Sequence, residues 1–223
     1  MNGEYGISCS SDSGNTWGAA SFASGDFPRV AVAPDGNVYV VFNSGNDINI
    51  NKYAPCSGNA SMTPTAGFPK KIVTANKVPC PVPGLDRCNS GNDLRSFQPA
   101  VDDTNSSHIY VAYAVNTAAG NENVVVQDST DGGSTWRAAV QLNGGGNARR
   151  YVPWVCATNG TAYVSWYDRR AANGTDNDLT DYYGASAALD GGGNLAAGAE
   201  FQINNTGTAD KECQAGKAGR QRG

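Results

Sequence analysis

The chain has 223 residues, with 16% charged side chains and a formal net charge of −4. Such a balance argues against nucleic acid as a partner, because nucleic-acid binding needs a basic face, and no stretch reaches the apolar length of a membrane span. The 28 glycines and the lack of a long helical pattern favour an all-β chain with many turns.

The first strand-like segment, residues 5–10, leads into a turn of distinctive composition. Residues 10–17 follow the pattern S-x-D-x-G-x-T-W, and residues 19–23 can form the next strand. In such a turn the Asp side chain accepts hydrogen bonds from nearby backbone N–H groups, and the Gly adopts a positive φ. The segment therefore predicts a β-hairpin. The chain is then expected to begin halfway through a four-stranded unit.

Units of four strand-like segments then follow one another three times. The first-strand prolines are residues 28, 99 and 153, and the second-strand tyrosines are residues 39, 110 and 163, so two landmarks move together along the chain. This spacing predicts a repeat architecture over residues 1–209. Residues 210–223 show no strand pattern and are expected to form a disordered tail. The expected strands are 27–32, 38–42, 48–53 and 70–75, then 97–101, 109–113, 123–128 and 138–142, then 152–156, 162–166, 181–186 and 201–203.

The turn motif recurs at residues 129–136, and a degenerate copy occupies residues 190–195. The three Asp positions, 12, 131 and 190, are 119 and 59 residues apart, which predicts one intervening unit near residue 71 without the motif. These copies resemble the Asp-box (BNR repeat) of sialidase-like β-propellers, where it joins the third and fourth strands of a blade. The resemblance implies a β-propeller of four-stranded antiparallel blades, apparently partial, with about three and a half of the family's six blades.

An open ring of blades would leave apolar faces uncovered, so we expect self-association through these faces or a partner segment. The six cysteines, residues 9, 56, 80, 88, 156 and 213, point to an oxidising compartment, either secreted or periplasmic, although no signal peptide is recognisable in this chain. A disulfide among Cys56, Cys80 and Cys88 would staple a long insertion. Cys9 and Cys156 are alternatively small buried apolar residues.

In the family that the motif resembles, the catalytic face lies opposite the boxes. The segment Trp-Tyr-Asp-Arg-Arg at 166–170 is expected on that face, and two adjacent arginines could bind a substrate carboxylate. The alternative is that Asp168 pairs with an arginine and fixes the loop. Sialidases bind the sugar carboxylate with three arginines and use a Tyr–Glu pair and an acidic residue in catalysis. Transferred to this chain, the catalytic candidates are Tyr167, Glu122 and Asp168, and the substrate-binding candidates are Arg29, Arg95, Arg150, Arg169 and Arg170.

Each of these assignments has a structural alternative: surface pairing for the arginines and packing for Tyr167. His108, the single histidine, is expected in a turn, which gives little support to histidine-based catalysis. Asp176, Asp178 and Asp181 offer oxygen ligands suited to Ca²⁺, with a solvated polar loop as the alternative; no cofactor is otherwise required. The sequence thus predicts a sialidase-like glycoside hydrolase acting on glycan termini, in a truncated form. The alternative is a non-catalytic propeller that binds glycans or proteins.

Overall fold

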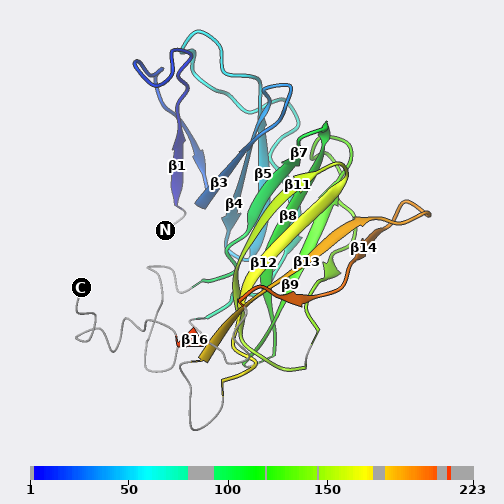
Figure 1. Ribbon diagram of the computed structural model, residues 1–223. Coiled ribbons are helices and arrows are strands. Elements are labelled where there is room, and N and C mark those ends of the chain that lie inside the picture. The colour runs from blue at the N-terminus through cyan, green and yellow to red at the C-terminus, as the bar shows by residue number, and fades with distance from the viewer. Residues whose placement is uncertain are drawn as a thin grey trace.

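The computed structural model describes residues 3–79, 93–118, 120–144, 146–172, 179–204 and 210–211, and within these ranges the regular elements are all β-strands (Figure 1). No helix in the described part of the chain has the length and apolar character needed to cross a membrane. The strands are β1 (Glu4–Ile7), β2 (Ser21–Ser24), β3 (Asp26–Val32), β4 (Val38–Ser44), β5 (Asp47–Tyr53), β6 (Lys70–Thr74), β7 (Gln98–Asp102), β8 (Asn105–Ala118), β9 (Asn121–Ser129), β10 (Val140–Gln141), β11 (Arg150–Thr158), β12 (Thr161–Asp168), β13 (Leu179–Leu189), β14 (Leu195–Ala197), β15 (Phe201–Gln202) and β16 (Asp210–Lys211).

The strands form antiparallel sheets that follow chain order. We call β1–β2 the half blade, β3–β6 the second blade, β7–β10 the third blade and β11–β15 the fourth blade. In the fourth blade, both β14 and β15 pair with β13, and so does β16, at the start of the expected tail. Figure 1 shows the sheets succeeding one another across the molecule from the blue N-terminal strands to the orange β14. The predicted partial β-propeller of four-stranded antiparallel blades is confirmed.

The apolar faces of successive sheets pack against each other because every second side chain of a strand points to the same face. Tyr39 and Val41 of the second blade share a core with Ile109 and Val111 of the third blade. A second core joins the third and fourth blades, and a third joins the half blade to the second blade. These cores explain why the second strands carry apolar residues on both faces.

The tyrosine landmark shows which blade face is uncovered. Tyr39, Tyr110 and Tyr163 occupy one register position, opposite Ala31, Ala100 and Cys156 respectively. Tyr39 and Tyr110 are 0% exposed beneath the following blade, whereas Tyr163 is 49% exposed. The fourth blade therefore presents a face that the described residues do not cover.

A kink recurs where each first strand begins. Phe27, Ser96 and Val152 have φ values of 52°, 46° and 51°, and each lies four residues before the partner of the landmark tyrosine. A positive φ is unfavourable for residues with a Cβ, above all for a β-branched one. Pro28 and Pro153 directly follow the kink, but Pro99 does not, so the prolines are a less reliable landmark than the tyrosines.

The two S-x-D-x-G-x-T-W turns have the same hydrogen bonds. Asp131 accepts bonds from the backbone N–H and the hydroxyl of Thr135 at 2.9 and 2.6 Å, and Asp12 accepts the matching pair from Thr16 at 2.9 and 2.5 Å. The hydrogen bonds from Thr16 lower the pKa of Asp12 to about 2. The turns thus lie at the end of the third strand of their blades, as expected.

Other sequence expectations need correction. His108 lies inside β8 rather than in a turn, is buried, and bonds through Nε2 to Asp128 at 2.8 Å. The insertion after β5 is joined to the half blade by a Cys9–Cys56 disulfide, not closed within itself by that cysteine. Cys156 is exposed and free, so it is not a small buried residue. Cys80, Cys88 and Cys213 lie outside the described residues.

Candidate functional site between the third and fourth blades

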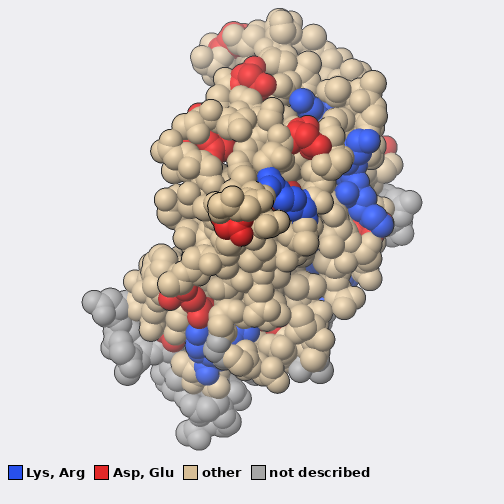
Figure 2. All heavy atoms as spheres, turned by 90° about the vertical axis from the view of Figure 1, so that its right-hand side faces the viewer, with Lys and Arg blue, Asp and Glu red and all other residues tan. Residues whose placement is uncertain are grey.

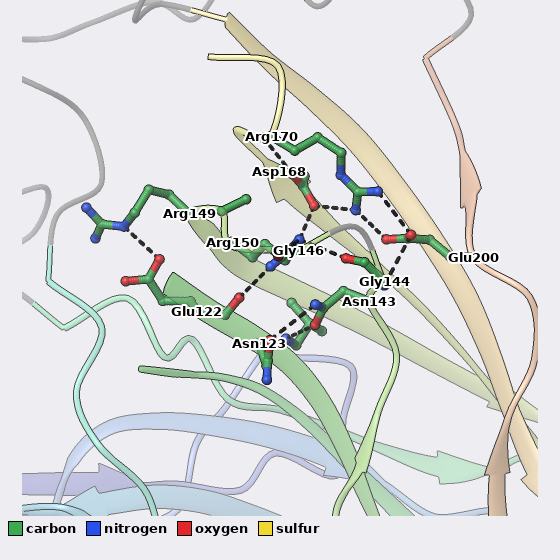
Figure 3. Close-up of polar contacts among 12 residues, drawn as sticks. Glu122, Asn123, Asn143, Gly144, Gly146, Arg149, Arg150, Asp168, Arg170 and Glu200 are labelled. Atoms are coloured by element: carbon green, nitrogen blue, oxygen red, sulfur yellow. Dashed lines mark hydrogen bonds and ion pairs between the residues drawn. The ribbon is translucent and has the colours of Figure 1, made fainter. Parts of the chain in front are cut away.

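The candidate site lies at the sheet ends opposite the S-x-D-x-G-x-T-W turns. Antiparallel strands place the loops from second to third strand, and from one blade to the next, at that end. Glu122 is the second residue of β9, Arg149 and Arg150 lie at the entry to β11, and Asp168 ends β12. Figure 3 shows Arg150, Asp168, Arg170 and Glu200 gathered together, with the Glu122–Arg149 ion pair to one side and joined to Arg150 through the Glu122 backbone carbonyl; we call these six residues the inter-blade cluster.

Arg150 forms the centre of the inter-blade cluster. Its side chain is 0% exposed and its Nε donates to Asp168 at 2.8 Å. Its two terminal nitrogens donate to the carbonyl oxygens of Glu122, Gly144 and Gly146 at 3.0, 2.8 and 2.9 Å. Glu122 belongs to β9 of the third blade, and the two glycines belong to the loop between β10 and β11, so the guanidinium fastens the third blade and this connecting loop to the fourth blade.

Asp168 is also fully buried and holds a second arginine. Arg170 donates to Asp168 through its backbone N–H at 2.8 Å and through its side chain at 2.6 Å. The same guanidinium pairs with Glu200 and lies 3.9 Å from the ring centroid of Tyr183. Burial opposes the charge of Arg170, but bonds to the two carboxylates outweigh burial and raise its pKa. Asp168 thus pairs with arginines and fixes its loop.

Glu122 combines burial with an unused oxygen. Its Oε2 accepts a bond from Arg149 Nε at 2.7 Å, while its Oε1 is buried without a hydrogen-bond partner. Burial raises the pKa of Glu122, and Arg149 only partly offsets that effect. Arg149 is itself partly exposed and also donates to the carbonyl of Pro79 at 3.1 Å. A carboxyl group in this setting favours its protonated form more than an exposed glutamate does.

Tyr167 is the solvent-accessible member of the predicted catalytic set. It is 43% exposed, whereas Glu122 and Asp168 are each 0% exposed. Its ring stacks on Tyr151 at 5.6 Å between centroids and contacts the Tyr182 ring at 5.1 Å. These three tyrosines are direct cross-strand partners on β11, β12 and β13, and therefore form an aromatic row beside the inter-blade cluster.

The other candidate arginines lie in different surroundings. Arg95, fully buried, bonds to Asp93 and to the carbonyls of Gly45, Asn46 and Ala75, and so fastens the second blade to the third much as Arg150 fastens the third to the fourth. Arg29 is exposed and bonds to the carbonyl of Pro28. The described contacts do not join Arg29, Arg95 and Arg150 into one carboxylate-binding triad.

Arg169 and Asp181 lie near the cluster and both are buried. Arg169 donates to the hydroxyl of Thr180 at 3.2 Å, and its backbone N–H donates to the carbonyl of Arg149. Asp181 accepts amide donors from Gln202 and Asn204 at 3.0 and 2.9 Å. Asp176 and Asp178 lie outside the described residues, and within the described ranges no group of three metal-ligating side chains occurs.

Sequence reasoning missed Arg149, Glu200 and the partners of Tyr167. Glu200 is one of only four glutamates in the chain, which was the available signal, but it lies outside the expected strands. Tyr151 and Tyr182 could have been found by aligning each strand on its register with Tyr167. Arg149 carries no local signal, because its contact with Glu122 joins residues 27 apart in the chain.

Two solved structures illustrate the similarity of this fold to β-propeller glycoside hydrolases. The GH93 α-L-arabinofuranosidase of Fusarium graminearum, in complex with arabinobiose, aligns with a TM-score of 0.53 and 18% identity over 92% of this chain and 60% of its own. The NanB sialidase of Streptococcus pneumoniae aligns with a TM-score of 0.50 and 9% identity over 89% of this chain and 28% of its own. No protein-family model and no curated protein sequence matches the chain.

These similarities define the fold, a β-propeller of the kind found in glycoside hydrolases, of which sialidases are one group among several. The chain spans less than two thirds of the length of either neighbour. The Cys9–Cys56 disulfide is typical of proteins that fold in an oxidising compartment.

Proposed function

We propose that the inter-blade cluster and the aromatic row form part of a glycoside hydrolase site that acts on glycan termini. The observation that supports this proposal most directly is the setting of Glu122, a buried carboxyl group near two arginines with a raised pKa, whose Oε1 has no hydrogen-bond partner. Hydrolysis of a glycosidic bond needs a proton donor whose carboxyl pKa is raised by its surroundings. The fold of the arabinofuranosidase and sialidase neighbours supports the proposal.

In this proposal, Tyr167 contacts the sugar and is the candidate nucleophile, because substrate can reach its exposed ring. Its phenol releases its proton to solvent as its oxygen bonds to the anomeric carbon, the glycosidic oxygen leaves with the proton of Glu122, and water then hydrolyses the bond between Tyr167 and the sugar. Glu122 is the proton donor and gains access to the glycosidic oxygen when Arg149 moves aside. Asp168 orients Arg150 and Arg170 rather than reacting, since both arginines already donate to it. Arg170 is engaged by Glu200, so an anionic sugar would have to displace Glu200 whereas a neutral sugar would not.

The test is hydrolysis of a fluorogenic sialoside and of 4-nitrophenyl α-L-arabinofuranoside by the wild type and three variants. Tyr167→Phe and Glu122→Gln should each lower kcat on the order of 100-fold. Tyr163→Phe is the matched control, because Tyr163 is exposed on the same strand and on the same face as Tyr167. Absence of turnover by folded wild-type protein, or equal activity in all four proteins, contradicts the enzymatic proposal.

A second candidate is a non-catalytic propeller that binds glycans. It is favoured by the full pairing of Asp168 and Arg150 inside the protein and by the exposure of Trp154, Tyr163 and Phe201 on the fourth blade. Figure 2 shows the side of the molecule where charged groups are interspersed within a mostly uncharged surface. Saturable binding of arabinobiose or sialyllactose without turnover would favour this candidate.

The same uncovered face of the fourth blade supports our further proposal that the protein self-associates. Sedimentation velocity over a concentration series would detect this association.

A further inference from the structure

The half blade has a β-strand edge that is paired in every other blade. The third strands β5, β9 and β13 each have neighbours on both sides, whereas β1 pairs only with β2 among the described residues. Gly3 O accepts a bond from Gly25 N, and antiparallel alternation then directs the backbone groups of Tyr5 and Ile7 toward β2 as well. The N–H and C=O groups of Glu4 and Gly6 therefore face the opposite, open edge.

An apolar groove runs beside this edge. The groove has a volume of about 430 Å³ and lies between the half blade, with Tyr5 and Ile7, and the second blade, with Val30, Val32 and Val40. Its lining includes no charged side chain. An occupant must therefore be apolar on the side that enters the groove.

The repeats show what normally covers this surface. Val30 and Val32 are each 63% exposed, although they lie on the first strand of a blade. At the matching register of the fourth blade, Val155 is 6% exposed, because the third blade packs over it. Among the described residues, the half blade consists of β1 and β2 alone, no strand covers Val30 and Val32, and the groove lies beside β1.

We propose that the half blade binds a β-hairpin supplied by a partner polypeptide. One strand of that hairpin pairs antiparallel with the open edge of β1, and its apolar side chains cover Val30 and Val32. Strand addition of this kind draws affinity from main-chain hydrogen bonds and specificity from pockets for alternate side chains. The partner strand carries the alternation seen in Thr161–Asp168, where every second residue is buried. This inference concerns the half blade and is independent of the proposed hydrolase site.

The probe is a synthetic hairpin corresponding to residues 150–168 with Cys156→Ser, labelled for fluorescence anisotropy and compared with a scrambled peptide. We expect saturable binding of one hairpin per chain and no binding of the scrambled peptide. Gly6→Pro should weaken hairpin binding at least tenfold, because proline removes an N–H from the open edge and leaves the bonds to β2 intact. Gly6→Ala is the matched control, since it adds a Cβ but keeps the N–H.

Val30→Lys provides a second variant in case Gly6→Pro perturbs folding, which circular dichroism melting would show. Val30 is already exposed, so its replacement should preserve the fold and abolish hairpin binding. No hairpin binding to the wild type, or equal affinity for Gly6→Pro and Gly6→Ala in folded proteins, overturns the proposal. Dimerisation of the wild type that Gly6→Pro abolishes, without hairpin binding, assigns the edge to a second copy and also overturns it.

Discussion

Replacement of Arg150 by methionine tests whether the buried guanidinium joins the blades or binds substrate. The change removes one contact to Asp168, one to the carbonyl of Glu122 in the third blade and two to carbonyls of the loop between the blades, all between 2.8 and 3.0 Å. Removing one partner of a buried ion pair destabilises a protein by about 3–5 kcal/mol, since the remaining charge loses its compensation. Arg170 still donates to Asp168, so we expect a loss of about 3 kcal/mol.

The assay is equilibrium unfolding in guanidinium chloride, followed by tryptophan fluorescence. Arg170→Met is the matched control: its side chain is 20% exposed and Arg150 still pairs with Asp168, so its removal should lower the free energy of unfolding by less than the removal of Arg150 does. Arg150→Met combined with Asp168→Leu should recover part of the loss, because the uncompensated buried carboxylate is gone. A loss below about 1 kcal/mol for Arg150→Met, together with weaker glycan binding, would refute a role of Arg150 in joining the blades and would favour a substrate-binding arginine.

Three further predictions concern stability. Asp131→Ala should lower the free energy of unfolding by roughly 1–3 kcal/mol, because the turn loses its hydrogen bonds to Thr135. Asp131→Asn should lose less stability, and neither change should alter glycan affinity. Altered affinity with an unchanged melting temperature would contradict our placement of the turn away from the site. Because the pKa of Glu122 is raised, its contribution to stability is present below about pH 4.5 and is lost as pH rises through the folded-state pKa. Glu122→Gln should therefore flatten the pH dependence of the melting temperature above about pH 4.5. An unchanged pH profile would contradict this account. Loss of the Cys9–Cys56 disulfide, which spans 47 residues, should lower stability by up to about 4 kcal/mol in denaturant titrations with and without reductant, whereas equal midpoints would argue against the bond.

The fold could be predicted because its signals are local or periodic. The apolar runs of the second strands, the recurring tyrosine at residues 39, 110 and 163, and the chemistry of the Asp turns each operate within a few residues. The boundaries were less predictable: β8 extends from Asn105 to Ala118, well beyond the expected 109–113, because pairing with β9 continues into polar sequence.

The contacts at the candidate site could not be predicted in the same way. Arg150 and Asp168 were both identified, but the sequence did not show that Arg150 also binds the carbonyl of Glu122 in the preceding blade and that of Gly144 in the connecting loop. The burial of His108 depends on Asp128, 20 residues further along the chain. Likewise, Cys9 meets Cys56 because the insertion folds back on the half blade, which the spacing of the cysteines does not determine.

Amide hydrogen exchange measured by mass spectrometry, with and without arabinobiose or sialyllactose, tests most directly whether glycans bind at the inter-blade cluster. We predict increased protection in peptides that contain Tyr151 and Tyr167, and unchanged exchange in the turns around Asp12 and Asp131. Protection confined to those turns, with none around Tyr167, would contradict the assignment of the site to this end of the blades.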